Sequence, residues 1–261
     1  METLLTEQEG RVGIIRLNRP DRLNAWNDVM GRELEKQIRT WNQDDTIGAI
    51  LVTGEGRAFC AGADIGGFAE RAETNREGGG EHMARGGAPI THLIRESKPT
   101  IAAVNGYAVG VGLTMILPFD VRFASSSALL SIRFIKMGLM PELGSTRLLA
   151  ELVGLGHATD MCLSGRMVPA DEALAMGLVT RVTEPEDLIA AALEKAHEMA
   201  NNPTQAMMMI KELLRKNPLD PDLEAVMERE NLRDQIARRL PDHHEAVAAF
   251  QAKRDPNFNQ S

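Results

Sequence analysis

The sequence predicts an α/β fold in which strand–strand–helix units stack as the turns of a spiral, followed by a helical C-terminal region. Two observations lead to this prediction. Short apolar runs typical of buried strands alternate with helical patterns in the first half of the chain, and helical periodicity dominates the second half. The length of 261 residues suits one large domain or two small ones. We therefore expect a spiral core over residues 1–200 and a helical region over residues 201–261.

The first elements are a pair of strands and an amphipathic helix. Residues 10–17 are typical of a strand, and residues 4–5 are expected to form its hairpin partner. Asn27 or Asp28 can cap a helix that runs to about Asn42. The apolar stripe of this helix consists of Met30, Leu34, Ile38 and Trp41.

Short strands and a loop follow in the middle of the chain. Residues 70–88 are rich in Gly, Glu and Arg, and we expect them to form a mobile loop or lid. Residues 111–117 can start a helix that Pro118 should end soon. The expected strands cover residues 47–53, 100–104, 120–124 and 128–132.

Glycines and prolines divide the second half into helices. Gly154, Gly165 and Gly177 separate three short helices. Pro185 and Pro203 each open a longer one. The expected helices cover residues 142–153, 158–163, 170–176, 185–199, 203–216, 222–239 and 242–254.

Composition narrows the classes of function. The formal net charge of −8 argues against a nucleic-acid partner, which would favour a basic face. We expect neither a secretory signal nor a membrane span, because the N-terminus lacks the required pattern and no stretch reaches ~18 apolar residues. Cys60 and Cys162 lie far apart and suit free thiols in a reducing cytoplasm. We interpret Cys60 as a small buried thiol, since no His stands near it in the sequence.

Two glycine-rich segments place backbone N–H groups where they could bind negative charge. Residues 104–114 have the pattern of a strand, a glycine turn and the start of a helix, which leaves N–H groups free. Residues 58–65 have small side chains where the backbone must approach another group closely. Two such donors aimed at one carbonyl oxygen would stabilise an enolate. Loss of one such donor typically costs ~3–4 kcal/mol of transition-state stabilisation.

Five motifs are distributed over nearly the whole chain, in residues 17–25, 59–65, 105–112, 138–142 and 249–254. Together they resemble the motifs of the crotonase (enoyl-CoA hydratase/isomerase) superfamily, and most of all its monofunctional 3,2-enoyl-CoA isomerases. The resemblance implies a spiral of ββα units with a helical C-terminal region that assembles the chain as a homotrimer or a dimer of trimers. It also implies an acyl thioester of coenzyme A as the substrate.

The resemblance also assigns binding residues. The thioester oxygen would lie between the N–H groups of Ala63 and Val111, and Val111 stands where hydratases have Gly. For Asp64 we favour a local role, in which its carboxylate caps N–H groups and holds the turn. Phe250 and Lys253 would reach the adenine and a phosphate, often from a neighbouring subunit. The remaining coenzyme A contacts would come from Arg22, Leu23 and the backbone of Ala61 to Ile65, including Ala63 and Asp64.

The position of the acid indicates the reaction. In the positions where hydratases of the family carry two glutamates, this chain has Thr114 and Phe134, so efficient hydration is not expected. Glu142 follows Pro141 at the expected start of a helix, where the isomerases have the glutamate that moves the proton. The sequence therefore favours a double-bond shift, from 3-enoyl-CoA to 2-enoyl-CoA, with Glu142 as the single proton carrier.

Three alternatives stay open at this point. The substrate could be a ring-derived acyl-CoA from aromatic-acid degradation, because relatives there carry an acid at the same position. A hydratase would need an acid from the loop, such as Glu70 or Glu73. A non-catalytic protein that binds coenzyme A or RNA is disfavoured by the net charge and by Glu142. We expect no metal and no cofactor beyond the coenzyme A of the substrate.

Overall fold

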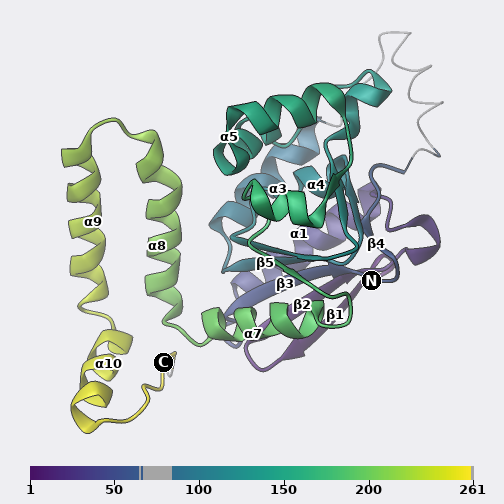
Figure 1. Cartoon of the computed structure of the whole chain (residues 1–261). Coiled ribbons are helices and arrows are strands. Elements are labelled where there is room, and N and C mark those ends of the chain that lie inside the picture. Colours follow the sequence, from purple (N-terminus) through teal and green to yellow (C-terminus); the bar gives the residue numbers. More distant parts are fainter. Residues whose placement is uncertain (65, 67–83, 260–261) are drawn as a thin grey trace.

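The computed structural model describes residues 1–64, 66 and 84–259. Two β-sheets and the helices around them form the main body, and the last three helices stand to one side of it (Figure 1). None of the helices in these residues is both long enough and apolar enough to cross a bilayer.

The larger sheet has six strands in the order β1-β2-β3-β5-β7-β10. β1 and β2 form an antiparallel hairpin, and every later pairing in this sheet is parallel. The hairpin confirms the prediction for residues 4–5 and 10–17. The strands are β1 (Leu4–Glu9), β2 (Val12–Leu17), β3 (Ala49–Gly54), β5 (Thr100–Val104), β7 (Val121–Ser125) and β10 (Arg181–Thr183).

The smaller sheet has four strands in the order β4-β6-β8-β9. β4, β6 and β8 are parallel to one another, whereas β9 runs antiparallel to β8. Apart from β8, these strands were not predicted, because two or three residues are too short for a period-2 pattern. They are β4 (Ala58–Cys60), β6 (Tyr107–Val109), β8 (Leu129–Ser131) and β9 (Val168–Pro169).

Each turn of the spiral contributes one strand to the larger sheet and one to the smaller sheet, and a helix follows. The first turn is β3, β4 and α3 (Ala84–Glu96), and the second is β5, β6 and α4 (Val111–Thr114). The third turn is β7 and β8, followed by α5 (Ser145–Ser164), and a short helix, α6 (Ala170–Ala175), precedes β10. This repeated order is the spiral of ββα units that the sequence predicts.

The first long helix forms for the reasons that its sequence suggests. α1 covers Asp28–Asn42, and the side chain of Asn27 accepts a hydrogen bond from the N–H of Met30, which caps its start. The four residues of the predicted stripe are all buried. The periodicity therefore located both the helix and its inner face.

Several predicted boundaries are wrong. Residues 84–88 belong to α3 rather than to a loop, while residues 70–83 of the predicted lid lie outside the described part of the chain. α4 ends at Thr114 instead of Leu117. α5 begins at Ser145 rather than at residue 142, because Leu143 and Gly144 both have left-handed backbone conformations, and it continues past a non-helical Gly154.

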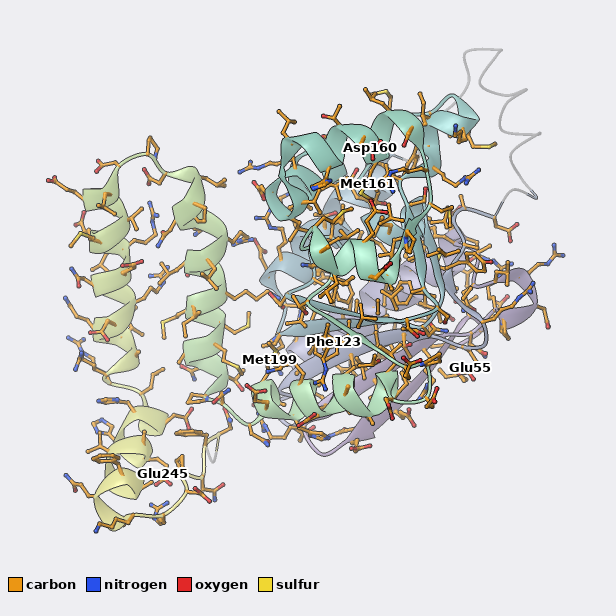
Figure 2. All side chains as sticks on the ribbon, in the orientation of Figure 1. Glu55, Phe123, Asp160, Met161, Met199 and Glu245 are labelled. Carbon is orange, nitrogen blue, oxygen red and sulfur yellow. The ribbon has the colours of Figure 1, made fainter. Side chains whose placement is uncertain are left out.

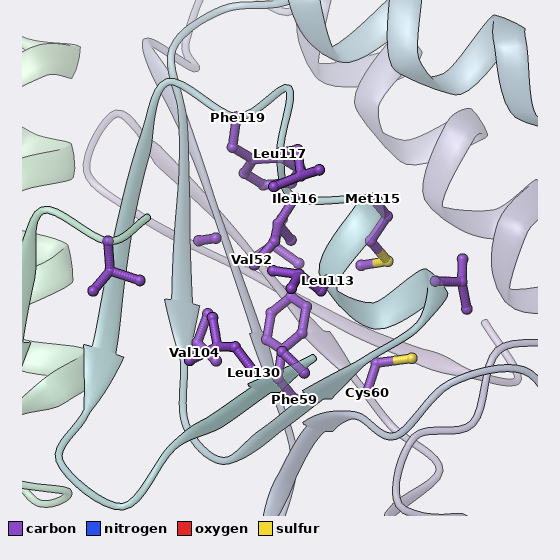
Figure 3. Packing of buried hydrophobic residues seen from close by; sticks show 14 of the residues in the cluster. Val52, Phe59, Cys60, Val104, Leu113, Met115, Ile116, Leu117, Phe119 and Leu130 are labelled. Carbon is purple, nitrogen blue, oxygen red and sulfur yellow. The ribbon is translucent and has the colours of Figure 1, made fainter. Parts of the chain in front are cut away.

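The core fills the space between the two sheets and the helices of the spiral. Figure 3 shows Phe59 of β4 at the centre of this packing, near Leu113 of α4 and Leu130 of β8. α4 approaches β4 so closely that a Cβ atom on Gly112 would lie 2.1 Å from the carbonyl oxygen of Cys60. A glycine is therefore required where the helix of the second turn crosses the strand of the first.

The C-terminal helices divide between the core and a separate arm. α7 (Leu188–Ala200) buries Leu188, Ala192 and Ala196 in the apolar cluster on the larger sheet. The next three helices, which we call the C-terminal arm, stand to the side of the body (Figure 1). The arm consists of α8 (Thr204–Lys216), α9 (Leu223–Ala237) and α10 (Pro241–Ala252).

Candidate active site

Two neighbouring strand ends bring the glycine-rich segments together. β4 and β6 are parallel, with Cys60 paired to Ala108, so the segments that follow them leave the same edge of the smaller sheet. A Cβ atom on Gly110 would lie 3.9 Å from the Cα of Gly62. Both glycines have positive φ angles, 111° for Gly62 and 55° for Gly110, which few other residues adopt. The two predicted donor segments are therefore adjacent.

The two expected N–H donors have no partner in the described part of the chain. Trp26 donates to the carbonyl of Gly62, and Asp64 donates to the carbonyl of Trp26, yet no described residue accepts from the N–H of Ala63 that lies between them. The same holds for Val111, at the first position of α4. The side chain of Val111 packs in the core, so its replacement of Gly leaves the N–H in place.

Glu142 lies on the loop before α5, and its carboxylate reaches the second turn of the spiral. Thr114 Oγ1 donates to Glu142 Oε1 at 3.5 Å, and Thr114 is fully buried in α4. Partial burial raises the pKa of Glu142, and the hydrogen bond from Thr114 opposes this only in part. A carboxyl group with a raised pKa can both accept and return a proton near neutral pH.

Thr114 connects the acid to the donors. Its N–H donates to the carbonyl of Gly110, and it lies three residues after Val111. Phe134 borders the same place, since a Cβ atom on Gly110 would lie 4.0 Å from the Phe134 Cζ atom. The structure thus brings Glu142 to Thr114 and Phe134 to Gly110, and Thr114 and Phe134 occupy the expected hydratase positions.

Asp64 has the local role predicted for it. It forms an ion pair with Arg19 at 2.7 Å and accepts a hydrogen bond from the N–H of Gly66. The hydrogen bond from Arg19 is the largest cause of the lowered pKa of Asp64. Asp64 therefore remains ionised and fixes the turn beside Ala63. Sequence reasoning misses this role of Arg19, although Arg19 lies within the motif at residues 17–25.

The residues expected to bind the nucleotide lie on two chain segments that contact each other, around Leu23 and around Ala61. Leu23 has a left-handed conformation, with φ of 51°, and its carbonyl accepts a hydrogen bond from the N–H of Ala61. Arg22 is exposed beside it. Ile65, also predicted to contact coenzyme A, lies outside the described residues. Sequence reasoning missed the structural role of Asn24, which is buried and donates to the carbonyls of Glu55 and Ala58.

Phe250 and Lys253 are not brought to this site within one chain. Phe250 belongs to α10 at the end of the arm and is 85% exposed, and Lys253 caps the same helix. Figure 1 shows α10 on the opposite side of the molecule from α4 and β4. One chain alone therefore separates these two predicted contacts from the others.

The Cys60 thiol in this region is inert. Burial raises the pKa of the Cys60 thiol to about 11, so it stays protonated and is not a nucleophile. Its Sγ instead contacts the carbonyl of Gly62. In the ranges that the structure describes, no cluster of three or more His, Cys, Asp or Glu side chains is arranged to hold a metal ion.

Comparisons with known proteins cover almost the full length. A family profile described as enoyl-CoA hydratase/isomerase matches residues 7–261. The chain is 36% identical over 262 residues to 1,2-epoxyphenylacetyl-CoA isomerase of Escherichia coli (strain K12), covering 99% of this chain and 98% of that protein. It is 38% identical over 262 residues to a probable enoyl-CoA hydratase of Rhizobium meliloti (strain 1021), with 98% of each covered. A putative enoyl-CoA hydratase/isomerase from Mycobacterium abscessus has a similar structure, with a TM-score of 0.91, 30% identity and 98% of each chain covered.

Proposed function

Because the chain belongs to the enoyl-CoA hydratase/isomerase family, we propose that it is an acyl-CoA isomerase that moves a double bond from 3-enoyl-CoA to 2-enoyl-CoA. One observation carries the proposal. The carboxylate of Glu142 reaches Thr114, three residues after Val111, whose N–H has no acceptor among the described residues, whereas Thr114 and Phe134 themselves cannot exchange protons at neutral pH.

A single carboxylate is sufficient for this reaction. Glu142 removes a proton from C2 of the 3-enoyl thioester, and the negative charge moves to the thioester oxygen. The N–H groups of Ala63 and Val111 bind that oxygen and stabilise the dienolate. The Glu142 carboxyl group then returns the proton to C4, which leaves the double bond between C2 and C3. Phe134 helps to exclude water, which keeps the Glu142 pKa raised and limits addition of water.

A second candidate substrate is a ring-derived acyl-CoA. Its support is the 36% identity to the protein named 1,2-epoxyphenylacetyl-CoA isomerase. The same Glu142 and the same two donors would serve, because this reaction also needs proton transfer next to a thioester. A hydratase, the name of another relative, would require an acid from the loop, such as Glu70 or Glu73, which lie outside the described residues.

We also propose that the arm completes the binding site in an assembly of three chains, or two such trimers. Residues 1–200 would be the spiral core and residues 201–261 the trimerisation region. The support is the isolation of Phe250 and Lys253 and the exposed apolar side chains of α8 and α9. Light scattering during size-exclusion chromatography would give the molar mass, and a monomer would contradict the assembly.

The two free thiols suit a cytoplasmic location.

The deciding experiment compares three thioesters: 3-hexenoyl-CoA, 2-hexenoyl-CoA and 1,2-epoxyphenylacetyl-CoA. We expect the wild type to convert 3-hexenoyl-CoA to the 2-enoyl product and to hydrate 2-hexenoyl-CoA only slightly. Glu142→Gln should lower kcat by about 10²–10⁴-fold. Hydration that survives this substitution would overturn the proposal. Turnover of the epoxide alone, lost in Glu142→Gln, would establish the second candidate instead.

A further inference from the structure

The direction of Glu142 depends on the two residues that follow it. Leu143 and Gly144 both have left-handed conformations, with φ angles of 58° and 74°. Gly144 adopts this conformation without strain, whereas the Cβ atom of Leu143 makes it unfavourable there. The sequence itself favours a helix from residue 142 onward, and such a helix would carry Glu142 as an ordinary first-turn acid. Some contact must therefore hold Leu143 outside the helix.

A hydroxyl group from another element supplies such a contact. Thr91 Oγ1 of α3 donates a hydrogen bond of 3.2 Å to the carbonyl oxygen of Leu143. In a helix that began earlier, this carbonyl would accept instead from the N–H of Arg147, four residues on. In the structure, the N–H of Arg147 donates to the carbonyl of Gly144. The Thr91 hydroxyl thus satisfies the Leu143 carbonyl in the loop conformation.

Thr91 belongs to a firmly held helix. Ile90 and Ile94, on the same helix, are buried in the main core. At its end, the carbonyl of Ile94 accepts a hydrogen bond from Lys211 Nζ, and Glu96 pairs with Arg215, both from α8. A hydroxyl group on such a support can fix the position of a loop that packs against it.

We propose that Thr91 is a positioning residue for the reaction. Its hydrogen bond to the Leu143 carbonyl holds the left-handed turn that directs the Glu142 carboxylate to Thr114, three residues after Val111. This inference rests on the proposed role of Glu142. Thr91 acts through the backbone of the loop and does not itself transfer a proton.

The test compares three variants with the wild type. Thr91→Val removes the hydroxyl group at nearly constant volume, and Thr91→Ser retains it. Thr180→Val is the matched control, because Thr180 Oγ1 also donates a partly buried hydrogen bond to a distant carbonyl, that of Arg122, at 3.1 Å. We expect Thr91→Val to lower kcat by about 10- to 100-fold with KM unchanged. Thr91→Ser should restore kcat, and Thr180→Val should lower only the melting temperature.

A substrate-free measurement gives a second readout. Infrared difference titration against Glu142→Gln isolates the signal of the Glu142 carboxyl group. If Thr91→Val releases the loop, the carboxyl group gains water and its pKa falls toward the ordinary value, whereas Thr180→Val leaves it unchanged. Equal behaviour of Thr91→Val and Thr180→Val in both measurements would overturn the role of Thr91. Full turnover by Glu142→Gln would instead overturn the proposed function, so the two failures are distinguishable.

Discussion

The spiral core and the C-terminal arm bury their apolar side chains to very different extents. In the core, Phe59, Leu113 and their neighbours are fully buried, and strands from all three turns enclose them (Figure 3). In the arm, neither α8 nor α9 has a buried residue, and Leu214 and Leu223 are 71% and 69% exposed. Figure 2 shows side chains of the arm extending to sides where no other element lies, with Glu245 far from Phe123 of the core.

The two regions also differ in how they are held. Apolar contacts and close backbone approaches fix the core, whereas α8 is joined to the body by polar contacts. Lys211 pairs with Asp120 at 2.6 Å, and Arg215 pairs with Glu96 at 2.7 Å. This difference supports two of our proposals: that the residues for the chemistry lie within one core, and that the arm packs against an apolar surface of another chain. Substitutions in the core should therefore affect folding and kcat, and substitutions in the arm should affect docking and KM.

The largest effect is expected at the contact between two turns of the core. In Gly112→Ala the added methyl group would lie 2.1 Å from the Cys60 carbonyl oxygen, so α4 must move away from β4. We expect the free energy of unfolding to fall by about 3 kcal/mol, with loss of activity. Urea denaturation would measure the change in the free energy of unfolding. Gly156→Ala is the control, because a Cβ atom there meets nothing within 4 Å. Equal stability of the two variants would contradict the assigned packing.

A smaller loss is expected where the arm meets the core. Lys211→Met keeps the long side chain but leaves Asp120 without its ion pair, in a place where the two side chains are 12% and 26% exposed. Because this burial lies between that of surface and interior pairs, we expect a loss of about 2 kcal/mol. Arg238→Met removes an exposed pair with Asp234 on α9 and should cost about 0.5 kcal/mol. Denaturant titration of both variants would show whether the Lys211 contact is the stronger one.

A change at the tip of the arm should affect binding alone. If Lys253 contacts the nucleotide from a neighbouring chain, Lys253→Ala should raise KM about 10-fold, equivalent to about 1.4 kcal/mol, with kcat unchanged. The control is a pantetheine thioester, which lacks the nucleotide. The variant and the wild type should turn this shorter substrate over equally. A loss of kcat with the shorter substrate would place Lys253 in the chemistry of the core.

The smallest effect concerns the stability cost of ionising Glu142, the proposed acid. Burial raises the pKa of Glu142 above its ordinary value of 4.5. The folded state therefore holds this proton more tightly than the unfolded state, and stability falls as pH rises from the ordinary to the raised pKa. Glu142→Gln removes this penalty, so it should melt at a higher temperature than the wild type at mildly alkaline pH.

The same melting experiment contains its own reference. Well below pH 4.5 the wild-type carboxyl group is protonated in both states, and the advantage of Glu142→Gln should disappear. Glu186→Gln, at an exposed position before α7, is the control for the removal of one surface carboxylate. A constant difference at every pH would show that packing, and not ionisation, separates Glu142→Gln from the wild type.

Much of the fold could be predicted because local patterns agree with the tertiary structure. The stripe on α1, the cap at Asn27 and the apolar runs of β3 and β5 all have one clear interpretation. The strands of the smaller sheet were harder to predict. β4 and β6 have only three residues each, and their pairing depends on the spiral rather than on their own sequences.

The candidate site could be proposed from residue types, but its geometry could not be predicted. The resemblance singled out Ala63, Val111 and Glu142, and local propensity placed Glu142 at the start of a helix. A contact from α3, 52 residues earlier in the chain than Leu143, accompanies the loop conformation instead. Arg19 and Asn24 were missed for the same reason, since each acts through partners distant in the sequence.

The two expected oxygen-binding groups belong to the main chain, and the acid belongs to a loop of a later turn. Main-chain groups do not depend on the identity of the side chain, as Val111 illustrates. If the proposed roles hold, the acid can change its position in the sequence without any change in the two main-chain donors. We therefore expect relatives with this fold to differ in their chemistry mainly through side chains on such loops.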